Sequence, residues 1–273
     1  MATAKIKAGL LVGYGINCEQ ELAAGFSLAG AQTEYLHVTE LLAKPEKVLN
    51  YSIFALPGGF SFGDDIASGK VMAVLLKSRL EQVVQRFINE GKLILGICNG
   101  AQIGIKWGLF PSAISVISTI QTIPDRPVSV QTQQATLTYN ASGHFECRWI
   151  SAKVTSQKCV FTQGLGVLHL PVAHGEGRFV ADAALIREWE TNEQLILRYC
   201  HLDGSPAHGE YPVNPNGSVD DVAGVCDTTG RVLLLMPHPE RNLSLQHHPA
   251  GKGGDGLKVL VNAVDYARKE LGD

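Results

Sequence analysis

The 273-residue sequence lacks any uninterrupted apolar stretch of the roughly 18 to 20 residues that a membrane helix requires. Its first residues, MATAKIKAGLLVGYG, carry two lysines and a short apolar stretch broken by glycines, without a signal-peptide cleavage pattern. This segment favours a buried first strand over a targeting sequence. We therefore expect no membrane partner.

Cysteine pairs are also missing. The six cysteines are scattered along the chain, at positions 18, 98, 147, 159, 200 and 226, and none forms a C-x-x-C pair. In a chain of this length, such scatter argues against a disulfide framework and against a zinc ribbon. We expect no metal site and a location in the reducing cytosol.

Charge of one sign is not concentrated anywhere. The formal net charge is −3, and no segment is a run of like charge, so nothing indicates binding to nucleic acid or to an anionic membrane. No Walker A sequence is present, and we expect ATP to bind a partner instead of this chain. The G-x-G at 13–15 is followed by Cys18 where a dinucleotide fingerprint needs glycine, which argues against a Rossmann cofactor.

What the chain does contain is an alternation of short apolar runs and helical patterns, in a sequence that is 45% hydrophobic. Strands are expected at 7–14, 33–38, 51–57 and 93–98, and helices at 19–31 and 68–91, with Ser68 as a cap and Gly91 as a left-handed stop. This alternation predicts an α/β fold, a mainly parallel open sheet with helices on both faces.

The second half of the chain reads differently. Residues 112–182 are β-like and predict an antiparallel elaboration of the parallel core, and the Pro- and Gly-rich residues 201–218 predict a long surface loop. A late strand at 231–237 and a closing amphipathic helix at 255–271 complete the pattern. We expect a single domain over 1–273.

Two segments could hold a nucleophile on a tight turn, Gly96-Ile97-Cys98-Asn99-Gly100 and Gly59-Phe60-Ser61-Phe62-Gly63. Such an elbow needs a strand running into the nucleophile and a helix starting directly after it, whose N-terminus stabilises negative charge. The context is present around Cys98. It is missing around Ser61, where Pro57-Gly58-Gly59 ends the strand too early, so Cys98 is the better candidate.

A thiol nucleophile needs a base, and the segment Met236-Pro-His-Pro-Glu240 offers one. The apolar run before it delivers His238 to the carboxyl end of a strand, where sites collect in open α/β sheets. Flanking prolines should keep the segment extended, so that Glu240, two residues on, points to the same side and orients His238. A surface turn with a salt bridge is the alternative reading of this segment.

Acyl transfer also needs hydrogen-bond donors aimed at the developing oxyanion. The N–H of Asn99, directly after the nucleophile, is one natural donor. The glycine pair Gly58-Gly59 follows a neighbouring strand and lets backbone approach a ligand closely, although a simple turn would use the same residues.

Together, GICNGAQ, PGGFSFGDD and MPHPERN resemble the class I (triad) glutamine amidotransferase family, whose fold is flavodoxin-like. Within that family, GINCEQE, PVAHGEGRF and NPNGSVDDVAG make the chain most similar to glutaminase subunits of phosphoribosylformylglycinamidine synthase, an enzyme of de novo purine biosynthesis. The resemblance spans nearly the whole chain, and its motifs come in the family's order.

The resemblance implies a role for each site residue. Cys98 would attack the side-chain amide of L-glutamine, His238 would take the thiol proton and give one to ammonia, and Glu240 would orient His238. Gly59 and Asn99 would donate N–H groups to the oxyanion, Gly58 would shape that turn, and Gln102 would help to hold the substrate.

The resemblance also implies partners. Ammonia would pass to a synthetase subunit that uses ATP and Mg to convert formylglycinamide ribonucleotide to the amidine, with a small bridging subunit in many bacteria. It gives no role to residues 201–213, to the 246–256 tail, or to His174 and Glu176. We expect the AHGEG loop to lie near the mouth of the site.

Two other readings stay open. A γ-glutamyl hydrolase or cysteine peptidase acting alone could use the same three side chains, and a non-catalytic α/β module that binds a small molecule would leave Cys98 an inert thiol. Nothing in the residues themselves names the ammonia acceptor.

Overall fold

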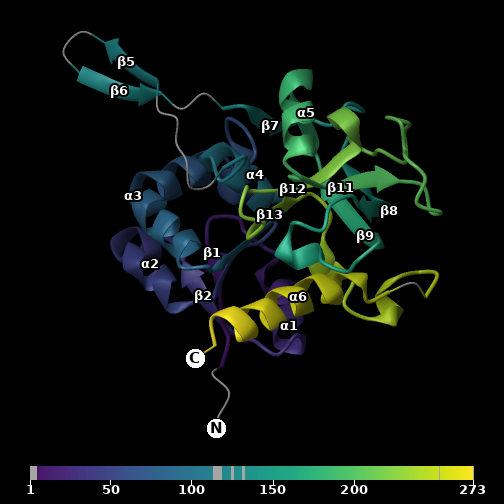
Figure 1. Cartoon of the computed structure of the whole chain (residues 1–273), viewed down its shortest axis with the longest axis horizontal. Helices are drawn as coiled ribbons and strands as arrows, with labels where there is room; N and C mark the ends of the chain where they lie inside the picture. Colours follow the sequence, from purple (N-terminus) through teal and green to yellow (C-terminus); the bar gives the residue numbers. More distant parts are fainter. Residues whose placement is uncertain (1–4, 113–118, 124–125, 131–132, 252, 273) are drawn as a thin grey trace.

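The structure is a computed structural model that describes residues 5–112, 119–123, 126–130, 133–251 and 253–272. A nine-stranded sheet forms its centre, with the strand order β2-β1-β3-β4-β13-β12-β11-β8-β9 (Figure 1). Five neighbouring strands at one end are parallel, and the other four continue the same sheet in antiparallel fashion. The predicted α/β fold class is confirmed.

The parallel half of the sheet has the order 2-1-3-4-5 of flavodoxin-like folds. Its strands, in spatial order, are β2 (Gln32–His37), β1 (Lys7–Val12), β3 (Ile53–Leu56), β4 (Leu93–Ile97) and β13 (Val232–Leu235). Every residue of β3, β4 and β13 is buried, because helices cover both faces of a parallel sheet. All five strands were expected from their apolar runs.

The antiparallel half comprises β12 (Val222–Cys226), β11 (Leu195–Cys200), β8 (Glu146–Val154) and β9 (Val167–His174). Along β9 buried and half-buried residues alternate, as a strand with one face on the core requires. β8 and β9 confirm the predicted antiparallel elaboration, whereas β11 and β12 were not predicted as separate strands.

Two small two-stranded sheets are separate from the nine-stranded sheet. β7 (Ala135–Thr138) pairs with β10 (Arg178–Ala181), and β5 (Thr119–Ile123) pairs with β6 (Arg126–Val130). Parts of the expected elaboration, residues 113–118, 124–125 and 131–132, lie outside the described residues.

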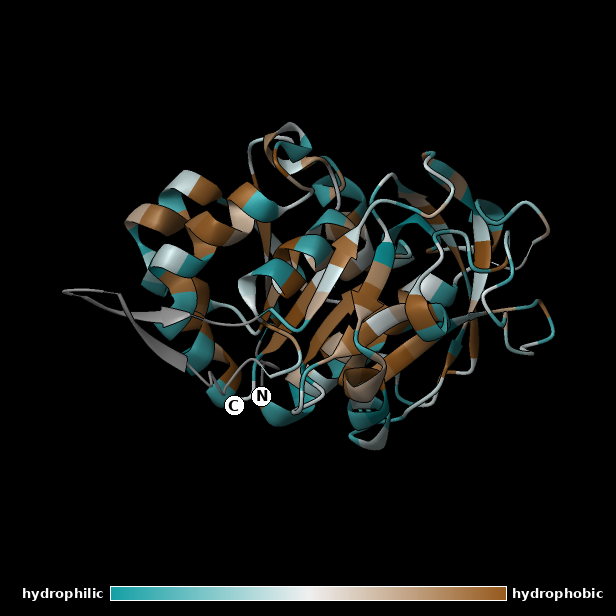
Figure 2. Cartoon of the chain, turned by 90° about the horizontal axis from the view of Figure 1, so that it is seen from above, coloured by the Kyte–Doolittle hydropathy of each residue, from teal (hydrophilic) through white to brown (hydrophobic). Residues whose placement is uncertain are grey.

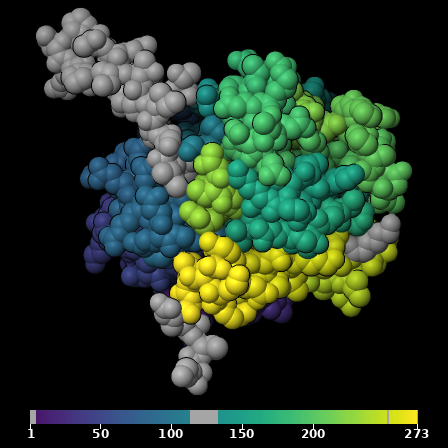
Figure 3. All heavy atoms as spheres, in the orientation of Figure 1, coloured from purple at the N-terminus to yellow at the C-terminus, as the bar shows by residue number. Residues whose placement is uncertain are grey.

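Helices cover both faces of the sheet (Figures 1 and 2). α1 (Glu19–Leu28) packs against the closing helix α6 (Asp255–Glu270), which runs along the lower edge of the molecule in Figure 3, and α3 (Lys70–Asn89) packs against α4 (Asn99–Trp107). The apolar strands lie between these helices, as the brown colouring of Figure 2 shows.

The remaining helical elements are short. They are α2 (Val38–Ala43), α5 (Ala183–Thr191) and the 3-10 turns η1 (Pro45–Asn50), η2 (Ser61–Asp64), η3 (Val160–Thr162), η4 (Val219–Asp221), η5 (Pro239–Arg241) and η6 (Leu245–His247). Within the described ranges, none of the helices combines the length and the apolarity needed to cross a bilayer.

The ends of α3 correct one expectation and confirm another. Gly69, with φ 71°, precedes the first helical residue, and Ser68 does not cap the helix. The backbone N–H of Ser68 instead donates to the Glu176 carboxylate, 3.2 and 3.3 Å from its two oxygens. Gly91 has φ 82° just beyond the helix, the left-handed stop that the sequence predicts.

Residues 201–218 form neither helix nor strand, but the prediction of a surface loop is wrong at its C-terminal end. Asn214 and Asn216 are 1% and 0% exposed. Asn216 Nδ2 donates to the carbonyl of Gly177 at 2.8 Å and to Tyr199 Oη at 3.0 Å. These asparagines satisfy buried polar groups beneath the loop, a role that composition alone does not reveal.

The turn between β4 and α4 is packed against backbone. A Cβ added to Gly100 would lie 1.8 Å from the carbonyl oxygen of Leu56, at the end of β3. The backbone of Leu56 cannot move away from such a Cβ, because β3 is hydrogen-bonded to β1 on one side and to β4 on the other. Only glycine lets α4 start this close to β3.

We expect Gly100→Ala to lower the free energy of unfolding by about 1–3 kcal/mol, the usual cost of an overpacked site. The loss should appear even though alanine is the better helix former by about 1 kcal/mol. The measurement is urea unfolding followed by circular dichroism. Gly166→Ala is the control, since a Cβ there meets nothing within 4 Å, and equal stability of the two variants would contradict the packing argument.

Candidate active site

Cys98 is the single residue between the end of β4 and the start of α4. Its backbone has φ 51° and ψ −107°, a conformation that costs a residue with a side chain roughly 1–3 kcal/mol. Its N–H donates to Leu235 O at 2.8 Å, and its carbonyl accepts the N–H of Gln102 at 3.0 Å. The predicted strand–turn–helix elbow is confirmed, with the thiol 5% exposed.

Ser61 does not occupy such an elbow. β3 ends at Leu56. Ser61 is the first residue of the 3-10 turn η2, and the loop from Pro57 to Phe60 separates it from the strand. Its N–H donates to the side-chain oxygen of Asn99 at 3.2 Å, so this segment braces the elbow of Cys98. The geometry therefore favours Cys98 over Ser61 as the nucleophile.

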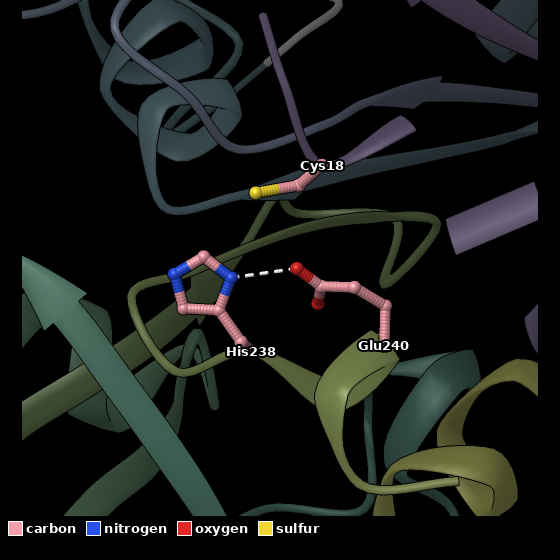
Figure 4. Close-up of side chains that lie close together, drawn as sticks. All are labelled: Cys18, His238 and Glu240. Atoms are coloured by element: carbon pink, nitrogen blue, oxygen red, sulfur yellow. Dashed lines mark hydrogen bonds and ion pairs between the residues drawn. The ribbon is translucent and has the colours of Figure 1, made fainter. Parts of the chain in front are cut away.

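His238 follows β13 and is held by Glu240. His238 Nδ1 lies 2.6 Å from Glu240 Oε1, and both side chains are almost completely buried (Figure 4). The alternative of a surface turn with a salt bridge is wrong. The expected geometry is also corrected, because Pro239 opens the 3-10 turn η5, for which the fixed φ of proline is suited, and the segment is not extended.

Gly58 brings the two halves of the site together. A Cβ added at Gly58 would lie 3.0 Å from His238 Cε1, 3.5 Å from Cys98 Cβ and 3.1 Å from Cys18 Sγ. His238, Cys98 and Cys18 therefore surround one backbone position at the carboxyl edge of the sheet. His238 Nε2 has no partner within the described part of the chain, and so it is available to a thiol or a substrate.

Cys18 is a member of the site that sequence reasoning did not assign, although its motif GINCEQE was noted. Its sulfur points toward the imidazole of His238 in Figure 4, and its thiol, the His238 ring and the Glu240 carboxylate each offer an atom within 4.8 Å of the others. This is a donor set that a metal could use. However, Arg241 Nη2 donates to Cys18 Sγ at 3.1 Å, and a guanidinium in that position repels a cation.

The charges around His238 decide its protonation. Burial by itself lowers the pKa of His238, but the negative charges of Glu240 and Cys98 outweigh it and raise the pKa well above 6.5. The imidazole therefore stays protonated as the pH rises past neutrality.

Two backbone N–H groups, those of Gly59 and Asn99, are candidates for an oxyanion site near Cys98. Gly59, at φ 146°, pairs with Ile16 in an isolated antiparallel bridge. The hydrogen bonds of this bridge are made by the adjacent residues, for example from the N–H of Phe60 to the carbonyl of Gly15 at 2.8 Å. Among the described residues, neither the N–H of Gly59 nor that of Asn99 has a backbone acceptor. This is the arrangement expected of an oxyanion site, and its use by a substrate stays a prediction.

Side chains of the first turn of α4 fasten this region. Asn99 Nδ2 donates to Gln102 Oε1 at 2.9 Å and to Asp64 Oδ1 at 3.2 Å, and Gln102 Nε2 donates to the carbonyl oxygen of Glu176. Gln102 is thus engaged at both ends of its amide as a brace. Its predicted contact with substrate is not among these bonds and stays a prediction.

Ala173 was also missed, because it contributes through its backbone and a carbonyl group leaves no signature in a sequence. The Cys98 thiol donates to Ala173 O over 3.6 Å, and the backbone N–H of His238 donates to Pro171 O at 2.8 Å. The end of β9 therefore runs past both candidate catalytic residues. This confirms that the AHGEG loop lies near the site.

All six cysteines of the chain are free thiols. Cys147 is exposed and the other five are buried.

We expect ¹⁵N NMR of histidine-labelled protein to show His238 titrating well above pH 6.5, because of its two negative neighbours. Glu240→Gln removes one of those charges and should move the titration to lower pH, so that His238 loses its proton earlier as pH rises. Glu210→Gln, a change at an exposed acid, is the control and should leave His238 unchanged. Titration of His238 at the same pH in all three proteins would contradict the electrostatic account.

Comparisons with known proteins place this geometry in a family. Residues 5–267 match the family described as CobB/CobQ-like glutamine amidotransferase domain. The chain is 42% identical to the phosphoribosylformylglycinamidine synthase subunit PurQ of Methanococcus maripaludis, over 96% of this chain and 98% of that protein. It is 40% identical to the PurQ of Dehalococcoides mccartyi, over 97% of this chain and 99% of that one.

A solved structure agrees with the sequence relatives. The structure of PurLQS from Thermotoga maritima matches with a TM-score of 0.68 and 28% identity, covering 96% of this chain and 99% of that chain. The resemblance drawn from the motifs is confirmed. The chain belongs to the CobB/CobQ-like glutamine amidotransferase domain family.

Proposed function

We propose that this protein is the glutaminase subunit of phosphoribosylformylglycinamidine synthase and that it hydrolyses L-glutamine to supply ammonia. The observation that carries the proposal is Cys98 on a strained strand–helix turn, with His238 packed beside it and bonded to Glu240. The near full-length relatives named as PurQ support the assignment to this synthase.

The first half-reaction uses the free sulfur of Cys98. The thiolate attacks the side-chain amide carbon of glutamine, and the carbonyl oxygen becomes an oxyanion that accepts N–H bonds from Gly59 and Asn99. The imidazolium of His238 gives its proton to the amide nitrogen as the C–N bond breaks. Ammonia leaves, and a γ-glutamyl thioester stays on Cys98.

The second half-reaction regenerates the thiol. His238, now neutral, takes a proton from water, which attacks the thioester and releases glutamate. Glu240 keeps the imidazole in the tautomer that presents Nε2 to the reaction, and its charge stabilises the imidazolium at both stages. Because the mechanism needs a reduced Cys98, we place the protein in the reducing cytosol.

The ammonia is then used by a partner subunit. The relatives are named as subunits of the synthase, and the Thermotoga structure is of PurLQS. We infer that this chain likewise docks on a synthetase subunit, which holds ATP and Mg and converts formylglycinamide ribonucleotide to the amidine. A small bridging subunit completes the proposed assembly.

The test is affinity labelling with a chloroketone analogue of glutamine, followed by peptide mapping. We expect label on Cys98, and we expect excess glutamine to protect it. The exposed thiol of Cys147 is an internal control, because glutamine should not change its labelling. Cys98→Ser should abolish both glutamine hydrolysis and specific labelling.

Three outcomes would overturn the proposal. Label on Cys98 that glutamine does not reduce, or protected label at another residue such as Ser61, would exclude this nucleophile. Glutamine hydrolysis at full rate that no synthetase subunit alters would favour a hydrolase acting alone. Labelling that develops only when the synthetase is added would indicate that docking assembles the site.

A further inference from the structure

His174, in the AHGEG loop at the end of β9, has no part in the mechanism described above. Its side chain is 2% exposed, and Nδ1 lies 3.0 Å from Asn140 Oδ1. Its other ring nitrogen, Nε2, is buried and has no hydrogen-bond partner among the residues that the structure describes. A buried nitrogen without a partner calls for a physical reason, because leaving such a group unsatisfied opposes folding.

The surrounding hydrogen bonds fix which nitrogen carries the proton. Asn140 Nδ2 donates to two carbonyl oxygens, those of His144 and His174, each at 2.8 Å, while Asn140 Oδ1 accepts the N–H of Gly177 at 3.0 Å. Asn140 Oδ1 is therefore an acceptor toward His174 as well. Nδ1 of His174 must carry the hydrogen, and Nε2 is left with a bare lone pair.

The ring is also neutral. Burial, together with the positive charge of His238, lowers the pKa of His174 to about 3. At any pH at which the protein functions, Nε2 is therefore an acceptor and never a donor. It can bind only a group that brings its own hydrogen.

His174 lies between two contacts to the nucleophile's elbow. The preceding residue, Ala173, accepts the Cys98 thiol hydrogen at 3.6 Å, and Glu176, two residues later, accepts a bond from Gln102 through its carbonyl. Gly177 packs directly against the imidazole of His174, because a Cβ added at Gly177 would come within 2.3 Å of the ring. The backbone on both sides of His174 is thus held against the elbow, and the ring is close enough to His238 for its positive charge to act on it.

We propose that Nε2 of His174 accepts a hydrogen bond from the nitrogen that leaves glutamine, both as the C–N bond breaks and in the free ammonia. This inference rests on the proposed glutaminase function and adds a residue to it. The thiolate and the oxyanion have no hydrogen to donate to Nε2 of His174. The leaving nitrogen does, because it carries two hydrogens in the amide and three in ammonia.

Cleavage of the C–N bond balances in protons and electrons with His238 as the proton donor and His174 as a hydrogen-bond acceptor. As the C–N bond breaks, its electron pair goes to nitrogen, and the imidazolium of His238 supplies the third hydrogen. His174 transfers no proton and contributes one hydrogen bond. Because it has no proton to give at Nε2, it holds the product as NH₃, the nucleophilic form that an ammonia acceptor needs, and does not convert it to ammonium.

The decisive comparison is between two substrates of the same enzyme, glutamine and glutamate γ-methyl ester. Both carry the same α-ammonium group, form the same thioester and use the same water. Only glutamine presents N–H groups at the leaving atom. The ratio of kcat/KM for the amide to kcat/KM for the ester therefore isolates the proposed bond, and it does not depend on the fraction of active protein.

Two matched variants separate the donor function of the His174 ring from its acceptor function. His174→Asn keeps a donor for Asn140 but removes the acceptor, and His174→Gln keeps an acceptor near the position of Nε2 but loses the donor. We expect His174→Asn to lower the amide-to-ester ratio about tenfold, the effect of one hydrogen bond lost in the transition state. His174→Gln should recover most of that ratio.

A structural role would give a different result. If His174 only holds Asn140, then both substrates lose activity together, the ratio stays constant, and His174→Asn is the milder variant. The same constant ratio would follow if the lone pair served the α-ammonium group or the water. A wild-type protein that hydrolyses neither substrate, alone or with the synthetase, would instead refute the proposed function itself.

Discussion

The site depends on one constrained turn, in which Cys98 adopts a left-handed conformation between a buried strand and a helix. Such a conformation persists only where the surroundings determine it fully. Here the N–H of Cys98 is tied to β13 and its carbonyl to the first turn of α4, while Gly100 lets that helix start against β3. The strain projects the sulfur from the sheet edge, where it meets His238.

A second constraint follows from burial. His238 and Glu240 are each 1% exposed, so their charges act on each other with little screening by water. The same low dielectric couples His238 to Cys98 and, with opposite effect, to His174. His238 therefore holds its proton, whereas His174 stays neutral. This separation of protonation states suits a reaction that must both donate a proton and release a neutral amine.

The sequence predicted the elements that carry a local signal. The parallel strands, α1, α3, α4 and α6 follow from apolar runs, helical periodicity and glycine stops, and the pairing of His238 with Glu240 follows from their spacing. The prediction of an extended segment there was wrong, because proline fixes φ equally well for a 3-10 turn. The prediction of Ser68 as a cap failed because the helix begins one residue later, with Gly69 at φ 71° in the capping position.

Features that arise from long-range contacts could not be predicted in this way. Cys18 reaches His238 from the first loop of the chain, and the carbonyl of Ala173 reaches Cys98 from β9. Asn214 and Asn216 were expected in a solvated loop but are buried: Asn216 bonds the carbonyl of Gly177 in the AHGEG segment, and Asn214 bonds Ser218 and Asp221. Apart from those of Asn214, these partners lie far away in sequence, and no periodicity or composition records them.

The most direct test of the whole account is to look for the thioester itself. Glutamine is mixed with the protein, with the synthetase subunit present if it is needed, and the reaction is quenched in acid within its first turnovers and examined by intact-mass and peptide mass spectrometry. The account predicts a γ-glutamyl adduct on Cys98 that disappears when glutamine is exhausted. Turnover of glutamine with no adduct on Cys98 at any time, or with an adduct on another residue, would contradict it.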